Sequence, residues 1–157
     1  MTTQPLILLA AGGTGGHLFP AEALGVELIR RGYRVRLATD SRALRYSGLF
    51  TADMTDVVPS ETVRGRDPVS LARTAIMLGY GMVVALNLVR RLKPSAVVGF
   101  GGYPSVSAVY AATMLKIPTL IHEQNAVIGR ANRALAGRVT AIATGFAEVR
   151  GVEGDLK

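Results

Sequence analysis

A chain of 157 residues with 49% apolar and 18% charged residues is long enough for one domain with an ordinary hydrophobic core, and its composition is not that of a disordered protein. It has no cysteine and only two histidines, which excludes disulfides and thiolate metal sites and makes a zinc site unexpected. The net charge is +7, and Glu123 is the only acidic residue between Asp67 and Glu148. This basic bias favours an anionic membrane surface, phosphorylated substrates or nucleic acid as partners. The alternative is a solvated basic face without a partner.

Short apolar runs alternate with longer amphipathic stretches along the chain. In chain order they predict a strand over Leu6–Ala11, a helix over Ala21–Arg31, a strand over Arg34–Thr39, a short helix over Ser41–Tyr46, a strand over Asp56–Pro59, a long helix over Pro68–Leu92, a strand over Ala96–Phe100, a helix over Ser105–Lys116, a strand over Pro118–Ile121, a helix over Val127–Ala136 and a strand over Val139–Ala143.

Strands that alternate with helices pair in parallel through right-handed crossovers. The sequence therefore predicts the α/β class, with an open, doubly wound parallel sheet in a Rossmann-like domain over residues 1–150. Ligands of such a domain bind outside the carboxyl ends of the strands. Residues 151–157 are polar and contain glycine, and we interpret them as a linker or a truncated end.

A glycine-rich turn, Gly12-Gly13-Thr14-Gly15-Gly16-His17, lies between the first predicted strand and the first predicted helix. Glycine lets the backbone approach a ligand closely, and a helix N-terminus presents unpaired N–H groups and a partial positive charge. The turn is therefore predicted to hold an anion, most simply a phosphate. His17 stands where the helix dipole favours a neutral imidazole. It is either a general base beside a bound sugar hydroxyl or a structural histidine that binds a phosphate or caps the turn.

This turn does not match the common nucleotide-binding fingerprints. Leu18 stands where the dinucleotide pattern G-x-G-x-x-G needs its third glycine, and no lysine follows as in a P-loop. Asp40 ends the second predicted strand, where a dehydrogenase binds a ribose hydroxyl. An NAD-dependent dehydrogenase therefore remains a minor alternative.

Two further loops leave the carboxyl ends of predicted strands, so all three loops open on one edge of the sheet. In Gly101-Gly102-Tyr103-Pro104-Ser105 the glycines allow close approach, and Ser105 is a candidate N-cap or phosphate ligand; the alternative is a tight turn without a ligand. In His122-Glu123-Gln124-Asn125 four hydrogen-bonding side chains follow one another, more than a structural loop needs. Glu123 either contacts a ligand or pairs with Arg130 or Arg133, and we expect His122 to be packed at the strand end.

The helix predicted over Pro68–Leu92 contains an apolar stretch, residues 75–86, with few polar breaks. This stretch is shorter than the roughly 20 residues that span a bilayer, yet too apolar around its circumference for an ordinary surface helix. It is either buried in the core or in contact with lipid, and we favour lipid because basic residues flank it. These basic residues are Arg64, Arg66, Arg73 and Arg138. The expected membrane patch consists of Ile76, Met77, Leu78, Tyr80, Met82 and Arg73.

Taken together, the three loops resemble those of a known family. The segments Gly12-Gly13-Thr14-Gly15-Gly16-His17-Leu18-Phe19-Pro20, Gly99-Phe100-Gly101-Gly102-Tyr103-Pro104-Ser105 and His122-Glu123-Gln124-Asn125 are similar to the signature loops of the MurG family. Its members are bacterial N-acetylglucosaminyltransferases that convert lipid I to lipid II in peptidoglycan synthesis. The resemblance runs along essentially the whole chain and includes Asn132.

The resemblance implies a GT-B enzyme, in which two Rossmann-like domains face each other across a cleft. This chain would be the N-terminal, acceptor-binding domain, and the C-terminal domain that carries most of the UDP-sugar site is absent from the sequence. The resemblance further implies that His17 is the catalytic base. It places Thr14, Gly15, Gly16 and Asn125 at the donor. It places Gly13, His17, Gly101, Gly102, Tyr103, Ser105, Glu123 and Asn132 at the acceptor.

The resemblance implies no metal and no cofactor, because UDP-N-acetylglucosamine is a substrate. The implied partners are lipid I, UDP-N-acetylglucosamine, anionic inner-leaflet phospholipid and the missing C-terminal domain, without nucleic acid. The implied location is peripheral, on the cytoplasmic face of the bacterial plasma membrane. The leading hypothesis is the N-terminal half of an inverting glycosyltransferase, inactive alone. The alternative is a membrane-docking module that binds a lipid diphosphate.

Overall fold

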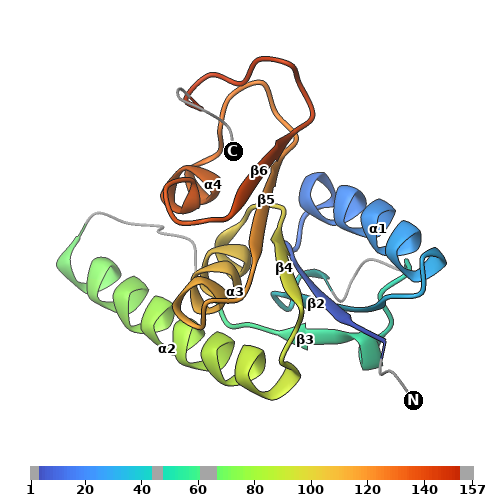
Figure 1. Ribbon diagram of the computed structural model, residues 1–157. Helices are drawn as coiled ribbons and strands as arrows, with labels where there is room; N and C mark the ends of the chain where they lie inside the picture. Colours follow the sequence, from blue (N-terminus) through green and yellow to red (C-terminus); the bar gives the residue numbers. More distant parts are fainter. Residues whose placement is uncertain (1–3, 44–47, 61–66, 153–157) are drawn as a thin grey trace.

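The structure is a computed structural model that describes residues 4–43, 48–60 and 67–152. Within these residues six parallel strands form one sheet in the order β3-β2-β1-β4-β5-β6 (Figure 1). The strands are β1 (Leu6–Ala10), β2 (Arg34–Thr39), β3 (Thr55–Val57), β4 (Ala96–Gly99), β5 (Thr119–Glu123) and β6 (Ala141–Thr144). This order is that of a doubly wound sheet, so the predicted fold class is confirmed.

Helices cover both faces of the sheet. Helix α1 (Gly15–Arg30) lies on one face, and α2 (Pro68–Leu92), α3 (Tyr103–Met114) and α4 (Arg130–Leu135) lie on the other (Figure 1). A short 3₁₀ turn, η2 (Ala52–Met54), precedes β3. Successive residues of β1 alternate between the two faces: Leu8 packs in the cluster under α2 and α3, and Leu9 in the cluster under α1. Strand β1 is therefore buried on both sides, as its unbroken apolar sequence predicts.

Several element boundaries differ from the sequence prediction. Helix α1 begins at Gly15 instead of Ala21, so the glycine turn supplies the first helical turn and Pro20 lies inside the helix. Helix α3 begins at Tyr103 instead of Ser105, and α4 begins at Arg130 instead of Val127. The short helix expected over Ser41–Tyr46 extends into residues outside the described part of the chain.

Strand β5 is longer than predicted and includes His122 and Glu123, which were expected in a loop. These two residues pair in parallel with Ala143 and Thr144 of β6. The hydrogen bonds that pair the strands come from the backbone, so polar side chains do not prevent pairing. The sequence pattern, which relies on apolar side chains, therefore misses these two strand residues.

The loops after β1 and β4 meet at the carboxyl edge, where the chain order of the sheet reverses. The Gly12 N–H donates to the Gly101 carbonyl over 2.8 Å, which joins the two loops. Gly101 and Gly102 have φ of 97° and 82°, and a Cβ on Gly102 would lie 2.6 Å from the Gly12 Cα. Only glycine fits both the conformation and the close approach at position 102. The glycines therefore fix the conformation of the two loops at the edge of the sheet where a ligand is expected.

Candidate functional site

A cavity of about 500 Å³ opens at this carboxyl edge. It lies between the N-terminal turn of α1, the loops after β4 and β5, the start of α4 and Leu78 of α2. Seven of the residues that the sequence marks as site residues line it together: His17, Gly101, Gly102, Tyr103, Glu123, Asn125 and Asn132. The prediction that the three loops open on one edge is confirmed by this shared cavity. No group of three or more potential metal ligands occurs in the described part of the chain.

The amides of the first glycine turn are largely used inside the protein. The Gly13 N–H donates to Oδ2 of Asp40 over 3.1 Å, and the Thr14 N–H donates to the Gly12 carbonyl over 2.8 Å. The expected role of the Gly13 amide in gripping a phosphate is therefore wrong, because that N–H already has a buried acceptor. Gly15 and Gly16 occupy the first two positions of α1, whose N–H groups helix geometry leaves without intrahelical partners. They remain the candidate anion donors of this turn.

Asp40 clamps the glycine turn from the end of β2. Its carboxylate accepts the Gly13 N–H and three bonds from Arg42, through the backbone N–H (2.9 Å), Nε (3.0 Å) and Nη2 (2.7 Å). Burial raises the pKa of Asp40, but these hydrogen bonds outweigh it and the pKa lies below its ordinary value. Both oxygens are engaged, so the ribose-binding role of the dehydrogenase alternative is not available to them.

His17 occupies the third position of α1 and lines the cavity. Its Nδ1 lies 2.9 Å from Oγ1 of Thr14, and a Cβ on Gly101 would lie 3.0 Å from its Nε2. Burial is the main cause that lowers the pKa of His17; Arg42 lowers it further, whereas Glu123 and Asp40 oppose the shift. The imidazole is therefore neutral near pH 7 and able to take a proton.

Glu123 is buried and acts as the centre of a hydrogen-bond network instead of an ion pair. Its carboxylate accepts from the Asn125 N–H (3.0 Å), Asn125 Nδ2 (2.9 Å), the Gly129 N–H (2.9 Å) and Asn132 Nδ2 (2.9 Å). Among the described residues it forms no salt bridge with Arg130 or Arg133, so that alternative is wrong. Burial raises the pKa of Glu123, but the bonds from Gly129, Asn132 and Asn125 outweigh it and hold the pKa below its ordinary value.

Asn132 is 2% exposed and has a fixed orientation. Its Nδ2 donates to Glu123 and to the His122 carbonyl, over 2.9 and 3.0 Å. Its Oδ1 has no hydrogen-bond partner among the described residues and lies 4.0 Å from the position of a Cβ on Gly101. The network of Glu123 thus presents an unpaired acceptor beside His17.

Ser105, an expected acceptor-binding residue, does not line this cavity. Ser105 lies in the first turn of α3 and is fully buried, and its hydroxyl has no hydrogen-bond partner among the described residues. Gly102 is the N-cap of the helix, so the predicted N-cap role of Ser105 is wrong. His122 is half-buried with its ring 5.5 Å from that of Phe100, which confirms its expected packing at the strand end. Thr14, Gly15 and Gly16 stand next to the cavity on the N-terminal turn of α1 without lining it.

The residues of the expected membrane patch separate onto two sides of α2. Ile76 and Tyr80 are 71% and 56% exposed, and Arg73 is also exposed. Met77, Leu78 and Met82 are half-buried; Leu78 lines the cavity and Met82 packs on the core. The six residues therefore do not form one surface. The exposed face of Ile76 and Tyr80 also includes Val69 and Val83.

Helix α2 as a whole is long and apolar enough, by length and composition only, to cross a membrane. The expectation that the apolar stretch is too short considered residues 75–86, whereas the helix has 25 residues and contains an 18-residue stretch with a mean hydropathy of 1.6. Gly81, Ala85 and Val89 are nevertheless buried on its inner side, which ties the helix to the domain. Arg138 lies over the Tyr110 ring at 5.3 Å, and Arg64 and Arg66 lie outside the described residues.

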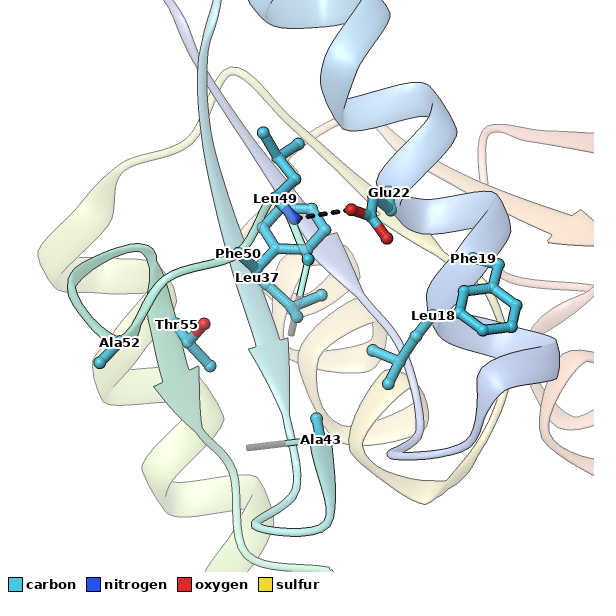
Figure 2. A pocket seen from close by; sticks show the side chains of 10 residues that line it. Leu18, Phe19, Glu22, Leu37, Ala43, Leu49, Phe50, Ala52 and Thr55 are labelled. Atoms are coloured by element: carbon cyan, nitrogen blue, oxygen red, sulfur yellow. Dashed lines mark hydrogen bonds between the residues drawn. The ribbon is translucent and has the colours of Figure 1, made fainter. Parts of the chain in front are cut away.

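A second, smaller cavity of about 130 Å³ lies on the α1 side of β2, away from these loops. Figure 2 shows Leu18 and Glu22 of α1 on the side of the helix that faces Leu37 and Phe50, and the Glu22 carboxylate accepts the Leu49 N–H over 2.6 Å. None of the site residues predicted from the sequence lines this cavity, and we assign it no ligand.

The role of Asp40 as a clamp and the cavity wall formed by Leu78 were missed by the sequence analysis. Asp40 could have been found from its position, because β2 is the neighbour of β1 and its end faces the glycine turn. Leu78 could not, because nothing in the helix sequence indicates which side of α2 faces the loops.

A comparison with known families decides the relationship of this chain. The profile described as the glycosyltransferase family 28 N-terminal domain matches residues 7–144. The chain belongs to this family. The resemblance drawn from the three loops is therefore confirmed, and the dehydrogenase alternative is set aside.

Individual relatives agree with this assignment. The chain is 76% identical over 146 residues to the UDP-N-acetylglucosamine--N-acetylmuramyl-(pentapeptide) pyrophosphoryl-undecaprenol N-acetylglucosamine transferase of Rhodopseudomonas palustris (strain ATCC BAA-98 / CGA009), which covers 93% of the chain and 40% of the relative. It is 70% identical over 156 residues to the protein of the same name from Nitrobacter hamburgensis (strain DSM 10229 / NCIMB 13809 / X14), with 99% and 42% covered.

Among solved structures, the crystal structure of Acinetobacter baumannii MurG matches with a TM-score of 0.75 and 30% identity, over 90% of this chain and 42% of that one. This match supports the doubly wound, Rossmann-like domain of a GT-B glycosyltransferase. The chain spans about 40% of the length of the curated relatives it matches.

Proposed function

We propose that this chain is the acceptor-binding part, residues 1–150, of a glycosyltransferase that moves N-acetylglucosamine from UDP-N-acetylglucosamine to lipid I and so forms lipid II. The observation that carries the proposal is the cavity in which His17, Tyr103, Glu123 and Asn132 meet, in a chain 76% identical to a relative named for this transfer. Because the chain spans about 40% of that relative, a C-terminal domain supplies most of the donor site, and this part alone is inactive.

The proposed transfer has a simple order of events. The C4 hydroxyl of the muramoyl sugar attacks the anomeric carbon of the donor, a new C–O bond forms, and the bond from that carbon to the UDP oxygen breaks with the electron pair leaving on UDP. His17 takes the hydroxyl proton at Nε2, the ring nitrogen beside Gly101. The N–H groups of Gly15 and Gly16, at the positive end of α1, attract phosphate oxygens, and the unpaired Asn132 Oδ1 accepts from a hydroxyl or amide of the acceptor.

The transfer is tested in the full-length protein with radiolabelled UDP-N-acetylglucosamine and a soluble lipid I analogue. His17→Ala should lower kcat by about 10²–10⁴-fold, the usual contribution of a general base, with a smaller effect on KM for the acceptor. The matched control is His122→Ala, which removes the other histidine of the chain from a packed position. If the unmodified protein transfers no sugar, the proposed function is wrong. If His17→Ala turns over at an unchanged rate, only the assignment of His17 as the base is wrong.

A second property, docking on a membrane, is favoured by the outer face of α2. Val69, Ile76, Tyr80 and Val83 are each more than half exposed and follow one another at helical spacing. With the net charge of +7, such a face suits the anionic cytoplasmic leaflet, where a lipid-linked acceptor would be collected. We therefore propose a peripheral location on that leaflet, with phospholipid as a partner.

Co-sedimentation of the chain with vesicles that contain phosphatidylglycerol tests the docking. Binding should require the anionic lipid, weaken as salt is raised, and fall at least severalfold in the double variant Ile76→Ser, Tyr80→Ser. The control is Val26→Ser on α1, which removes an apolar side chain of 53% exposure from the other face of the sheet. Equal loss in both variants, or binding to neutral vesicles, contradicts docking through α2.

A further inference from the structure

The residue that caps α1 does not use its side chain as a cap. Thr14 has the extended backbone of an N-cap, φ −127° and ψ 148°, but its hydroxyl accepts no N–H of the first turn. A threonine at this position usually accepts the N–H of the second or third helical residue. Here the third residue is His17, and its N–H donates to the Thr14 carbonyl over 3.0 Å. The Thr14 hydroxyl is turned to the His17 ring instead, at 2.9 Å from Nδ1.

This contact matters because a neutral imidazole carries one proton, on either of two nitrogens. The charged groups that face the ring are Arg42 and Asp40 from the end of β2 and Glu123 from β5. Among the described residues, Asp40 and Glu123 form no hydrogen bond with the ring, because their oxygens accept from Arg42 and from N–H groups of the loops. The Thr14 hydroxyl is the hydrogen-bond partner of Nδ1, and as a hydroxyl it can accept from Nδ1–H or donate to an unprotonated Nδ1. The surroundings of Nε2 therefore decide between the two tautomers.

The opposite edge of the ring faces the cavity. His17 Nε2 and Asn132 Oδ1 lie 3.0 and 4.0 Å from the same point, the place of a Cβ on Gly101. The Asn132 oxygen stays an acceptor, because the Nδ2 of that amide is held by Glu123. Among the described residues no hydrogen bond joins it to Nε2, so a proton on Nε2 lacks an acceptor within that part of the chain, whereas a proton on Nδ1 has the Thr14 hydroxyl.

We infer that Thr14 is a positioning residue: its hydroxyl accepts the Nδ1–H of His17, and this holds Nε2 unprotonated and turned into the cavity. Nε2 then has the lone pair that a base needs, and the ring is fixed in direction as well as in tautomer. The use of that lone pair in sugar transfer rests on the proposed function, but the tautomer itself does not. Thr14→Val keeps the shape of the side chain and removes the acceptor, and Thr14→Ser keeps the acceptor.

The tautomer is read directly from long-range ¹H–¹⁵N correlation spectra of the ¹⁵N-labelled chain at about pH 8, well above the ordinary pKa of histidine. The chain has two histidines, so His17→Gln assigns the signals, and His122 reports whether each variant is folded. In the unmodified chain His17 should show a protonated Nδ1 and an unprotonated Nε2. Thr14→Val should shift the tautomer ratio toward Nε2–H by roughly two- to tenfold, the equivalent of one ordinary hydrogen bond, and Thr14→Ser should restore it.

The matched control is Thr51→Val, which removes the hydroxyl from another threonine at an N-cap, that of η2, away from both histidines. A protonated Nε2 in the unmodified chain overturns the inference, and so does a ratio that Thr14→Val leaves unchanged while the His122 signals stay in place. If the tautomer is as inferred but the full-length protein transfers no sugar, the proposed function fails and the inference stands. If transfer occurs with Nε2 protonated at rest, the inference fails and the function stands.

Discussion

Two buried carboxylates set the shape of the loops around the cavity. Asp40 holds the first glycine turn through the Gly13 N–H, and Glu123 holds the loop after β5 through the N–H groups of Asn125 and Gly129. Hydrogen bonds to an ionised group contribute about 1.5–3 kcal/mol each, more than a neutral pair. Both carboxylates therefore act mainly on the backbone. Side chains that the sequence alone marks as ligands for substrate are, at these two positions, supports for their neighbours.

Adding one methyl group at Gly13 tests how closely Asp40 holds the glycine turn. A Cβ on Gly13 would lie 2.4 Å from Asp40 Oδ1 and 2.7 Å from the Ala43 backbone nitrogen, which cannot move aside. Gly13→Ala should lower the free energy of unfolding by about 1–3 kcal/mol, the usual cost of overpacking, as measured by urea denaturation.

The matched control is Gly16→Ala, three residues along the same turn. A Cβ on Gly16 meets nothing within 4 Å and stands inside α1, so this change should raise the stability by about 0.5–1 kcal/mol. A Gly13→Ala protein as stable as the control would show that Asp40 does not hold the turn closely.

At the scale of elements, α2 shows what the sequence can and cannot predict. Its bounds are predicted correctly because the signals are local: Asp67 accepts the Ser70 N–H over 2.9 Å as the N-cap, and Lys93 ends the helix in the left-handed conformation just before Pro94. Which residues of α2 face the domain is not a local property. The apolar residues surround the helix, so only the packing on α3 distinguishes half-buried Leu78 from exposed Ile76.

The contrast between local signals and contacts made by the assembled fold also explains the other differences between the sequence predictions and the structure. The order of strands and the meeting of three loops on one edge follow from the alternation of helices and strands, which the sequence carries. The acceptors of the Gly13 N–H and of the Asn132 amide come from other loops, over separations of 27 and 9 residues. Contacts of this kind depend on the assembled fold, so Glu123 looked like half of an ion pair in a basic stretch.

The contact of α2 with the domain is tested at Gly81. A Cβ at this position would lie 2.2 Å from the Pro59 carbonyl oxygen, so Gly81→Ala should push the helix away and lower the stability by about 1–3 kcal/mol in urea denaturation. Gly79, two residues earlier in the same helix, has nothing within 4 Å, and Gly79→Ala should stabilise by about 0.5–1 kcal/mol. If Gly81→Ala and Gly79→Ala shift the midpoint of urea denaturation equally and in the same direction, α2 does not pack on the domain at Gly81 as described.

At the scale of the whole molecule, three groups of the site, the half-buried His17 and the buried Asp40 and Glu123, respond to acid in the same direction. The pKa values of His17, Asp40 and Glu123 are all lowered from their ordinary values of 6.5, 3.8 and 4.5. As the pH falls, the unfolded chain therefore binds these protons before the folded chain does. Stability must then decrease with falling pH, below about pH 6.5 through His17 and below about pH 4.5 through the two carboxylates. The site that carries the proposed function therefore loses stability in acid.

Glu123→Gln measures the share of one carboxylate in this response. The variant keeps the size of the side chain but replaces one acceptor oxygen with a donor that faces the N–H groups of Gly129 and Asn132, so it should lose about 1–3 kcal/mol at pH 7. Below pH 4.5 the difference from the unmodified chain should shrink, because protonation of Glu123 removes the same charge-assisted bonds. Urea denaturation at a series of pH values between about 7 and 3 gives both quantities. Glu148→Gln removes an exposed carboxylate of the same type and serves as the control for net charge. A Glu123→Gln difference that stays constant across this range would mean that the charge on Glu123 does not hold the loop after β5.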